Sequence, residues 1–382
     1  MSGSIHSASY SSDQAYTVDL QQQVARLQAL LETSRQVHAA TQLEELLNTV
    51  LRIVVRELEL PGAAITQPQM VYGSMPPQPW ETCPRFPLSD KGGSILAELV
   101  VAPPEGRGLS IYEQDFLEGL SLQAGVALEN ARFHQRNLEW ARVQQDLEAA
   151  RRIQRSWLPQ QMPDIPGYSV AIRSSACYEV GGDYVDIVES PDGHQIMTVA
   201  DVAGKGLASA IFGTTFRSAF RAISATRVPL PELAARLNDQ HYAEGEEAQQ
   251  RYVTAIFLKL DPTTHSIEIV NAGHNPGFLL VGEKAQTIHA SGTPIGLVPG
   301  MKYTSERFDF PGGAKWLFYP DGLTEVFRGE DEFGTDRLLE AFRQCNRTDG
   351  AVILSSLWQE LHDFSGGAQQ QDDMTALTLL RE

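Results

Sequence analysis

Four short acidic motifs carry the residue types that could hold a metal ion. Residues Glu179–Asp186 place carboxylates around a Gly-Gly pair, and Asp201 ends an apolar run and is followed by small residues. Asp321 and the pair Asp372-Asp373 also border apolar runs. Carboxylate and main-chain oxygens are the ligands that Mg²⁺ prefers, and the sequence contains no histidine or cysteine cluster. A single Asp-Gly would indicate only a turn, but the four motifs together predict a site for Mg²⁺ or Mn²⁺.

The order of the motifs resembles that of bacterial metal-dependent serine/threonine protein phosphatases of the PPM type, which are similar to protein phosphatase 2C. Within them it is most similar to the sporulation stage II E-type branch, and the resemblance spans about 149–381. The motifs that carry it are Glu-x-Gly-Gly-Asp-Tyr-x-Asp at 179–186, Ala-Asp-Val-x-Gly-Lys-Gly at 200–206, Asn-Ala-Gly-His-Asn-Pro at 271–276, Gly-x-Pro-x-Gly-Leu at 292–297, Asp-Gly-x-Thr-Glu at 321–325 and Asp-Asp-Met-Thr at 372–375.

The resemblance implies a centre with two ions, Mn²⁺ or Mg²⁺, that hydrolyses a phosphomonoester. Asp201 would bridge both ions and Asp183 would bind one of them, which makes these two the main catalytic carboxylates. The full implied ligand set is Asp183, Asp201, the carbonyl of Val202, Asp321, Asp372 and, ranked second to Asp372, Asp373.

Further residues of the motifs have roles toward the substrate. Gly204 and Gly206 would allow close approach of the substrate, and Lys205 could contact its phosphate or be simply solvated. His274 could act as a general acid toward the leaving serine oxygen, or it could fix a loop by hydrogen bonds. Pro320 departs from the family pattern, which more often has threonine or serine there, and proline removes a backbone donor and fixes φ.

The expected function is therefore that of a protein serine/threonine phosphatase. Its implied substrate is a phosphorylated regulatory protein of the anti-sigma-factor-antagonist type. The alternative is a catalytically weak or silent scaffold that binds the same partner. A third interpretation makes the protein chiefly a ligand sensor with the phosphatase as its readout.

Composition limits the partners and the compartment. The 382 residues carry a formal charge of −18, so no nucleic acid partner is expected, because no basic stripe could neutralise phosphates. Cys83, Cys177 and Cys345 are widely separated and form neither a disulfide framework nor a zinc motif. No apolar run approaches the ~20 residues that span a bilayer, and the first residues lack a signal-peptide core. These features predict a soluble, cytoplasmic protein without a membrane partner.

The N-terminal part is expected to be a tail followed by a small regulatory domain. Residues 1–16 are small and polar and predict disorder. Residues 17–133 predict a helix from about Val18 and then a domain that resembles GAF sensory domains. Its elements would be two helices that start at capping boxes, strands near 63–66, 70–72 and 94–101, and a proline-dense loop at 75–87; the boxes are Thr41–Glu44 and Ser110–Glu113. It is shorter than a usual GAF domain, which leaves open both a structural or dimerising role and a small-ligand sensor.

Residues 120–159 predict a coiled-coil linker helix. Its seam alternates four- and three-residue steps from Leu122 to Trp157: Leu122, Val126, Glu129, Phe133, Arg136, Trp140, Val143, Leu147, Ala150, Gln154 and Trp157. Such a seam favours pairing with a second chain, which predicts a homodimer, whereas the alternative is a helix packed against its own domain. Pro159 would end the helix.

Residues 160–382 are expected to form the phosphatase domain. Strands are predicted at 168–176, 184–188, 195–200, 252–260 and 266–272, and helices at 207–225, 231–243 and near Leu338 and Ile353. The resemblance implies a PPM-type β-sandwich flanked by helices. The whole chain is thus expected to be an α+β multidomain protein with a GAF-like α/β domain, a long helix and this sandwich.

Overall fold

The computed structural model describes residues 35, 42–159, 161–177, 179–345, 348–368 and 370–382. The predicted tail at 1–16, the helix predicted from Val18 and Thr41 of the first capping box lie outside the described residues. Contacts divide the chain into two compact units, one ending at Val143 and the other beginning at Gln144.

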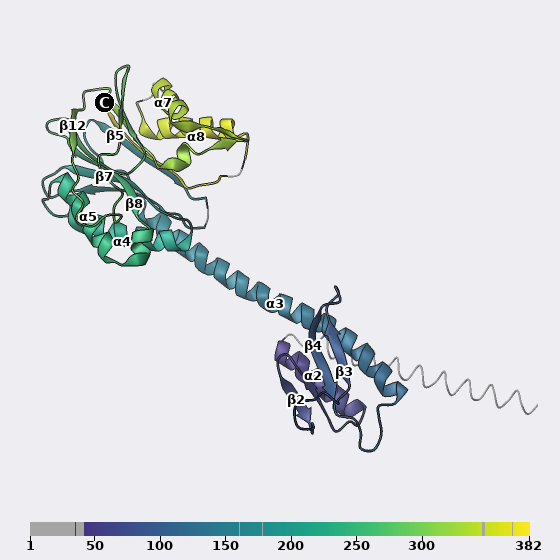
Figure 1. The fold of residues 1–382 in the computed structure, drawn as a ribbon. Helices are drawn as coiled ribbons and strands as arrows, with labels where there is room; N and C mark the ends of the chain where they lie inside the picture. The colour runs from purple at the N-terminus through teal and green to yellow at the C-terminus, as the bar shows by residue number, and fades with distance from the viewer. Residues whose placement is uncertain (1–34, 36–41, 160, 178, 346–347, 369) are drawn as a thin grey trace, which may run out of the picture. The chain divides into compact units, whose positions relative to one another are not determined.

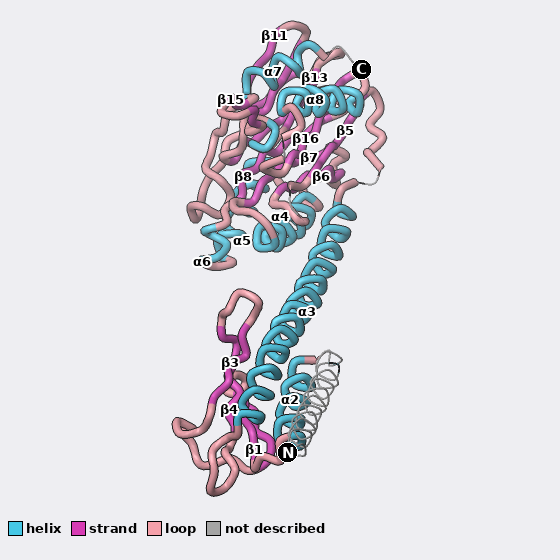
Figure 2. Tube along the Cα trace, turned by 90° about the vertical axis from the view of Figure 1, so that its right-hand side faces the viewer, coloured by secondary structure: helices cyan, strands magenta, loops and turns pink. Residues whose placement is uncertain are grey.

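The N-terminal unit is a four-stranded antiparallel sheet in the order β2-β1-β4-β3. Helix α2 and the first part of α3 cover one face of this sheet and bury a leucine- and valine-rich core (Figure 2). The elements are α2 (Leu43–Glu57), β1 (Gly62–Ile65), β2 (Met70–Gly73), β3 (Arg85–Ser89), β4 (Ile95–Val101) and α3 (Ile111–Trp157).

The start of α3 was readable from sequence, but that of α2 was only partly so. The Ser110 hydroxyl accepts from the Glu113 N–H at 3.2 Å and the Glu113 carboxylate accepts from the Ser110 N–H at 2.6 Å, which confirms this capping box. Helix α2 begins at Leu43 with Gln42 as its N-cap, and Gln42 makes no side-chain cap.

Strand β3 corrects the prediction of an unbroken proline-dense loop over 75–87. Arg85–Ser89 pairs with β4 and contains Pro87. Because β3 is the edge strand of the sheet, proline is tolerated there. Helix α3 comes so close to this strand that a Cβ on Gly125 would lie 2.2 Å from the Ser89 carbonyl oxygen.

The C-terminal unit is a sandwich of two five-stranded antiparallel sheets, as expected. Their strand orders are β11-β10-β13-β16-β5 and β12-β9-β8-β7-β6. The first seven elements are β5 (Tyr168–Ser175), β6 (Asp183–Glu189), β7 (Gln195–Val202), α4 (Leu207–Ser224), α5 (Leu230–Ala243), α6 (Glu246–Gln250) and β8 (Val253–Asp261). The next six are β9 (Ser266–Ala272), β10 (Gly277–Val281), β11 (Lys284–Ile288), β12 (Glu306–Asp309), β13 (Lys315–Phe318) and the 3₁₀ turn η1 (Asp321–Leu323). The last are β14 (Phe327–Arg328), β15 (Asp331–Glu332), α7 (Gly334–Gln344), α8 (Gly350–Ser365) and β16 (Met374–Arg381).

Three apolar layers hold this unit together. One core lies between the sheets, a second joins α4 and α5 to the β7–β8 sheet, and a third joins α7 and α8 to the β13–β16 sheet (Figure 1). Strand β7 is buried along nearly its whole length, as its uniformly apolar sequence predicts. Layers of this kind fix the ends of the central strands, where the acidic motifs lie.

Candidate metal centre

Strands β6 and β7 bring the first two acidic motifs together. Asp183 and Asp201 are directly opposite each other in the antiparallel register. Gly182 makes this close approach possible, because a Cβ there would lie 2.8 Å from the Val202 carbonyl oxygen and 3.0 Å from Asp201 Oδ1. The Gly-Gly pair therefore lets two carboxylates and one main-chain carbonyl crowd at one strand end.

Electrostatics show that the downstream motifs reach the same place. Burial, followed by the carboxylates of Asp321 and Asp372, raises the pKa of Asp201 to about 8. Burial and then Asp201 raise the pKa of Asp183 well above its ordinary value. The pKa of Asp321 is raised by burial and then by Asp372. Lys205 acts in the opposite direction on Asp201 and Asp321, but the raised pKa values show that burial and the mutual repulsion of the carboxylates outweigh it.

The two adjacent aspartates near the C-terminus have different partners. Asp373 accepts hydrogen bonds from the Gly182 N–H at 2.9 Å and the Cys177 N–H at 2.8 Å. Asp372 instead forms an ion pair with the Lys205 ammonium at 2.7 Å. Asp373 thus anchors the Gly-Gly loop, and this arrangement favours Asp372 as the ligand of the pair.

Lys205 pairs with a candidate metal ligand, while about half of its side chain remains exposed. Besides its ion pair with Asp372, its ammonium donates to the Gln371 carbonyl at 3.1 Å. Gly204 and Gly206, which flank it, have φ values of 96° and 80°, in the region that favours glycine. The loop between β7 and α4 therefore curls so that a lysine covers one of the candidate metal ligands.

His274 makes hydrogen bonds that could fix a loop, while its Nε2 atom is buried without a partner among the described residues. Its ring Nδ1 atom lies 2.8 Å from the Thr254 hydroxyl, and its main-chain N–H donates to the Asn271 side-chain oxygen at 2.8 Å. The residue is only 5% exposed, and burial lowers the pKa of its imidazole to about 4. A ring that is neutral at pH 7 and buried supports the hydrogen-bonding alternative over the general acid.

Asp186, the last residue of the Gly-Gly motif, is not available to a metal. Its carboxylate accepts from Arg221 Nε at 2.6 Å and Nη2 at 2.7 Å, and also from the Tyr184 hydroxyl. It is fully buried and faces helix α4. Alternation along β6 points the side chains of Asp183 and Asp186 to opposite faces of the sheet, which agrees with a ligand set that contains Asp183 and not Asp186.

The residues present fit a hard divalent cation, although the described side chains do not yet converge at metal-binding distance. Among the described residues, no three histidine, cysteine, aspartate or glutamate side chains already meet at metal-binding distance. However, Asp183 Oδ2 is buried and has no hydrogen-bond partner within the described chain. An unsatisfied carboxylate oxygen beside further carboxylates and a main-chain carbonyl is the donor set that Mg²⁺ or Mn²⁺ would take.

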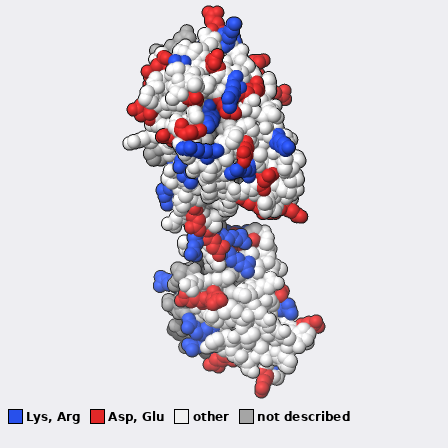
Figure 3. All heavy atoms as spheres, turned by 90° about the vertical axis from the view of Figure 1, so that its left-hand side faces the viewer, with Lys and Arg blue, Asp and Glu red and all other residues white. Residues whose placement is uncertain are grey.

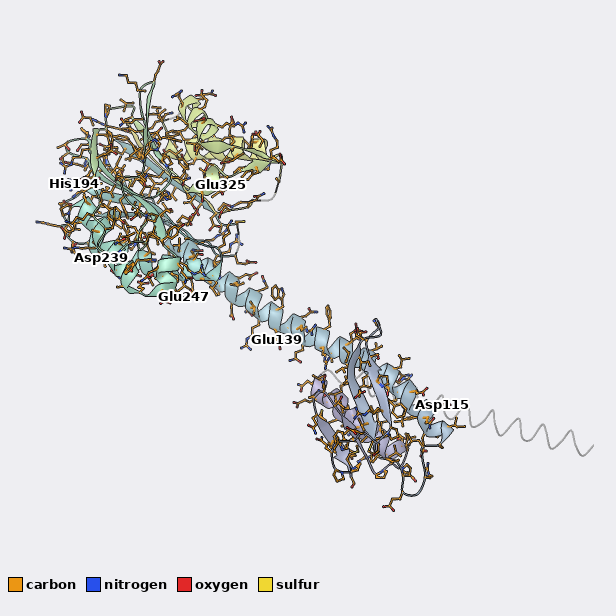
Figure 4. All side chains as sticks on the ribbon, in the orientation of Figure 1. Asp115, Glu139, His194, Asp239, Glu247 and Glu325 are labelled. Atoms are coloured by element: carbon orange, nitrogen blue, oxygen red, sulfur yellow. The ribbon has the colours of Figure 1, made fainter. Side chains whose placement is uncertain are left out.

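Two cavities border the centre. One of about 340 Å³ is lined by Gln154, Gly181 and Asp183, among others. The other, of about 180 Å³, is lined by residues that include Glu325 and Asp372. Glu325, labelled in Figure 4, lies on the segment between β13 and helix α7. Burial, followed by the carboxylates of Asp321 and Asp372, raises the pKa of Glu325 too.

Sequence reasoning missed several residues around the centre. The Gln154 side chain donates to the Gly181 carbonyl at 2.7 Å and accepts from the Gly181 N–H at 3.1 Å. Ser209 and Arg251 also lie beside the loop that follows Asp201. Each belongs to a helix or loop whose sequence gives no signal of a role at the centre.

Comparison with known proteins identifies the C-terminal half. The family model described as Stage II sporulation protein E (SpoIIE) matches residues 191–382, half of the chain. The chain belongs to this family. The chain is also similar to Protein IcfG of Synechocystis, with 26% identity over 263 residues that make up 62% of this chain and 41% of IcfG. It thus spans less than half of that relative.

Two further likenesses concern one relative and one solved structure. Phosphoserine phosphatase RsbU of Bacillus subtilis is 25% identical over 301 residues, which are 75% of this chain and 84% of RsbU. The SiaA-PP2C domain of Pseudomonas aeruginosa superposes with a TM-score of 0.57 at 22% identity, covering 64% of this chain and 98% of that domain. The last comparison confirms the PP2C-type sandwich fold of this SpoIIE family member.

No described helix combines the length and apolar character needed to cross a membrane. On the face shown in Figure 3, acidic and basic side chains are interspersed and form no continuous basic stripe.

Proposed function

We propose that this SpoIIE family member is a metal-dependent phosphatase that removes phosphate from serine or threonine of a regulatory phosphoprotein. The observation that carries the proposal is the cluster of Asp183, Asp201, Asp321 and Asp372 at one end of the sandwich. The first three have raised pKa values, and one Asp183 oxygen is buried without a partner among the described residues. Groups with this pattern of perturbed ionisation are typical of functional sites.

The chain's own residues would hold the reaction in place. Two Mn²⁺ or Mg²⁺ ions, when bound, would supply an activated water and neutralise phosphate charge. Asp201 and Asp183, fixed opposite each other across β6 and β7, would hold the ions with the Val202 carbonyl, and Asp321 and Asp372 would complete the set. Metal binding at Asp372 would displace the Lys205 ammonium from this carboxylate, toward solvent or substrate. His274, buried and neutral, would keep the 271–276 loop in place.

The substrate class follows from the relatives. RsbU carries the name phosphoserine phosphatase, and the resemblance noted from the motifs points to partner-switching regulators. We infer a small phosphorylated protein of the anti-sigma-factor-antagonist type as the substrate, and a phosphoserine or phosphothreonine on its surface as the reacting group.

A phosphate-release assay tests this proposal. The full chain is incubated with a generic aryl phosphate and with a serine-phosphorylated regulatory protein, each with Mn²⁺, with Mg²⁺ and with a chelator. Metal-dependent release from both substrates is expected. Binding of the phosphoprotein without release at any metal concentration would instead establish the silent scaffold.

We further propose that the N-terminal unit is a GAF-like regulatory domain that acts through α3. The double hydrogen bond of Gln154 ties the last turns of α3 to Gly181, next to the glycine that the Asp373 carboxylate holds. A displaced Gln154 would therefore loosen the loop that carries Asp183. If a metal-binding carboxylate is in the binding position for only a fraction of the time, the apparent metal affinity falls by that fraction.

The exposed part of the α3 seam supports a homodimer. Leu122, Phe133, Trp140 and Val143 are 64%, 66%, 66% and 49% exposed, and Glu139, labelled in Figure 4, lies on the same exposed stretch. Farther along, Gln154 and Trp157 are used within the C-terminal unit, because the Trp157 ring is stacked by Arg217. We therefore shorten the proposed dimer seam to about 122–147. Sedimentation of wild type and of a Trp140→Glu, Leu147→Glu double variant tests it: a wild-type monomer would rule it out.

A further inference from the structure

A cationic side chain without a partner lies beside the candidate metal centre. The β7–β8 pairing runs from Gln195–Leu260 to Val202–Val253, and the Ala203 N–H then donates to the Tyr252 carbonyl at 2.9 Å. The next residue along, Arg251, lies over Gly204, and its Nη1 atom is 2.6 Å from the position that a Cβ on Gly204 would take. Among the described residues, the Arg251 guanidinium has no hydrogen-bond or ion-pair partner.

A buried hydroxyl without a partner points to the same spot. Ser209, in the first turn of α4, is completely buried, and its Oγ atom accepts or donates no hydrogen bond within the described chain. That Oγ lies 3.5 Å from the same Gly204 Cβ position, beside Arg251 Nη1. Burying a hydroxyl without a hydrogen bond is unfavourable, which indicates a group that the free protein lacks.

The metal ligands are immediate neighbours of this hydroxyl. The Cβ atom of Ser209, the Val202 carbonyl oxygen and Asp201 Oδ1 all lie within 3.5 Å of the position that a Cβ on Gly182 would take. Helix α4 also begins here, and Gly206 at its N-cap supplies no side-chain cap for the first N–H groups. A helix N-terminus favours an anion, and a guanidinium fork matches the oxygens of a phosphate.

Hydrogen bonds hold the backbone of Arg251 in place. His241 is buried, and its Nε2 atom lies 3.0 Å from the carbonyl oxygens of both Arg251 and Ala248. Arg251 caps the short helix α6, whose residue Glu247 is labelled in Figure 4. The backbone is therefore held while the side chain remains available. Lys205 differs, because it is already paired with Asp372.

We propose that Arg251, with Ser209 and the N-terminus of α4, binds the phosphoryl group of the substrate and the phosphate product. The inference rests on the proposed phosphatase function and adds a phosphate-binding residue to it. Arg251 would donate to two phosphoryl oxygens, and the Ser209 hydroxyl would donate to a third. The missing side chain of Gly204 leaves the room that the Arg251 guanidinium takes up next to the Ser209 hydroxyl.

Inorganic phosphate is the probe for the test. Its dissociation constant is measured by calorimetry on the Mg²⁺-loaded full chain, and its inhibition constant is measured in the aryl phosphate assay. Arg251→Ala should weaken both about tenfold, the loss expected for a charge-assisted bidentate contact. The two constants for Arg251→Lys should lie between those of wild type and Arg251→Ala. Neither variant should change the Mg²⁺ concentration needed for half-maximal rate. Arg236→Ala, which removes an exposed arginine paired with Glu232 on α5, is the matched control.

Ser209→Ala separates a ligand role from a structural one. Because the hydroxyl has no partner in the free protein, its removal should leave the melting temperature unchanged or raise it. Phosphate should nevertheless bind about threefold more weakly, as expected for one hydrogen bond.

The outcomes distinguish this inference from the proposed function. If wild type hydrolyses phosphoserine protein but Arg251→Ala binds phosphate as tightly as wild type, the phosphate site is wrong and the phosphatase assignment stands. If wild type binds phosphate through Arg251 but hydrolyses nothing, the site stands and the proposed function is wrong. Failure of wild type to bind phosphate at millimolar concentration overturns the inference as well.

Discussion

Strand β6 carries two aspartates three residues apart that experience opposite surroundings. Asp186 is fully buried, yet Arg221, Tyr184 and the Ile187 N–H satisfy its carboxylate. Asp183 has a buried oxygen with no hydrogen-bond partner in the described part of the chain, and its pKa is raised by burial and by Asp201. A structural carboxylate is thus recognised by its completed contacts, and a functional one by the contacts that it lacks.

Helix α4 repeats the same contrast at its two ends. Its last turns supply Arg221 to Asp186, which joins the helix to the sheet. Its first turn presents Ser209, whose buried hydroxyl is unpartnered, next to Asp201 and Val202. The C-terminal end of α4 therefore stabilises the fold, and its N-terminal end carries the hydroxyl that we propose as a phosphate ligand.

The largest expected effect separates the two aspartates by activity. Asp201→Asn should lower turnover about 1000-fold or more, because it removes a carboxylate from the metal centre. The same change should stabilise the metal-free protein. The folded-state pKa of about 8 lies above the unfolded value, so folding takes up protons and stability falls as pH rises from about 4 to 8.

Two measurements check this prediction. In chelator, the variant should melt at least about 2 °C above wild type at pH 8, and the difference should shrink toward pH 5. Turnover is followed at saturating Mn²⁺. A variant that kept more than a few per cent of the wild-type rate would show that Asp201 is not a ligand.

The complementary change concerns Asp186. Asp186→Ala should destabilise the fold by about 2 kcal/mol, because it leaves the Tyr184 hydroxyl and Arg221 without their acceptor. The metal requirement of the remaining folded enzyme should not change. Denaturant unfolding is the measurement, with Glu189→Gln, an exposed carboxylate at the end of the same strand, as control. Equal stability of the two variants would contradict the assignment.

Local patterns of residue types were sufficient to predict the acidic motifs and five strands of the phosphatase domain, whereas the sandwich itself was expected from the family resemblance. The contact of Asp186 with Arg221 was not predicted, since a strand and most of a helix separate the two residues in the chain. Ser209 and Arg251 were missed because what marks them is the lack of hydrogen-bond partners among the described residues. Only side-chain geometry shows such a lack. The strand containing Pro87 was not predicted because proline usually indicates a loop. Its place at the edge of the sheet, where proline is tolerated, is not visible in the sequence.

A smaller effect is expected where α3 meets the centre. Gln154→Ala should raise the Mn²⁺ concentration for half-maximal rate about tenfold, because residues that hold a metal-ligand loop commonly change affinity by that order. The rate at saturating Mn²⁺ should recover. Gln145→Ala, on an exposed position of the same helix, is the control. An unchanged metal requirement in Gln154→Ala would contradict control through this contact.

The smallest effect belongs to the N-terminal unit, where a satisfied carboxylate can be compared directly with Asp183. The Arg107 guanidinium, more than the Ser110 cap, lowers the pKa of Glu113 to about 2, although the side chain is buried. Because this folded-state pKa lies below the unfolded value of about 4.5, its stabilising contribution is present above pH 4.5 and is lost as pH falls toward 2. Glu113→Gln should destabilise the first turn of α3 by about 1 kcal/mol at pH 7, and this difference from wild type should vanish near pH 2. Hydrogen exchange of the first-turn amides, with exposed Glu118→Gln as control, measures it, and a difference independent of pH would mean that the charge of Glu113 contributes nothing.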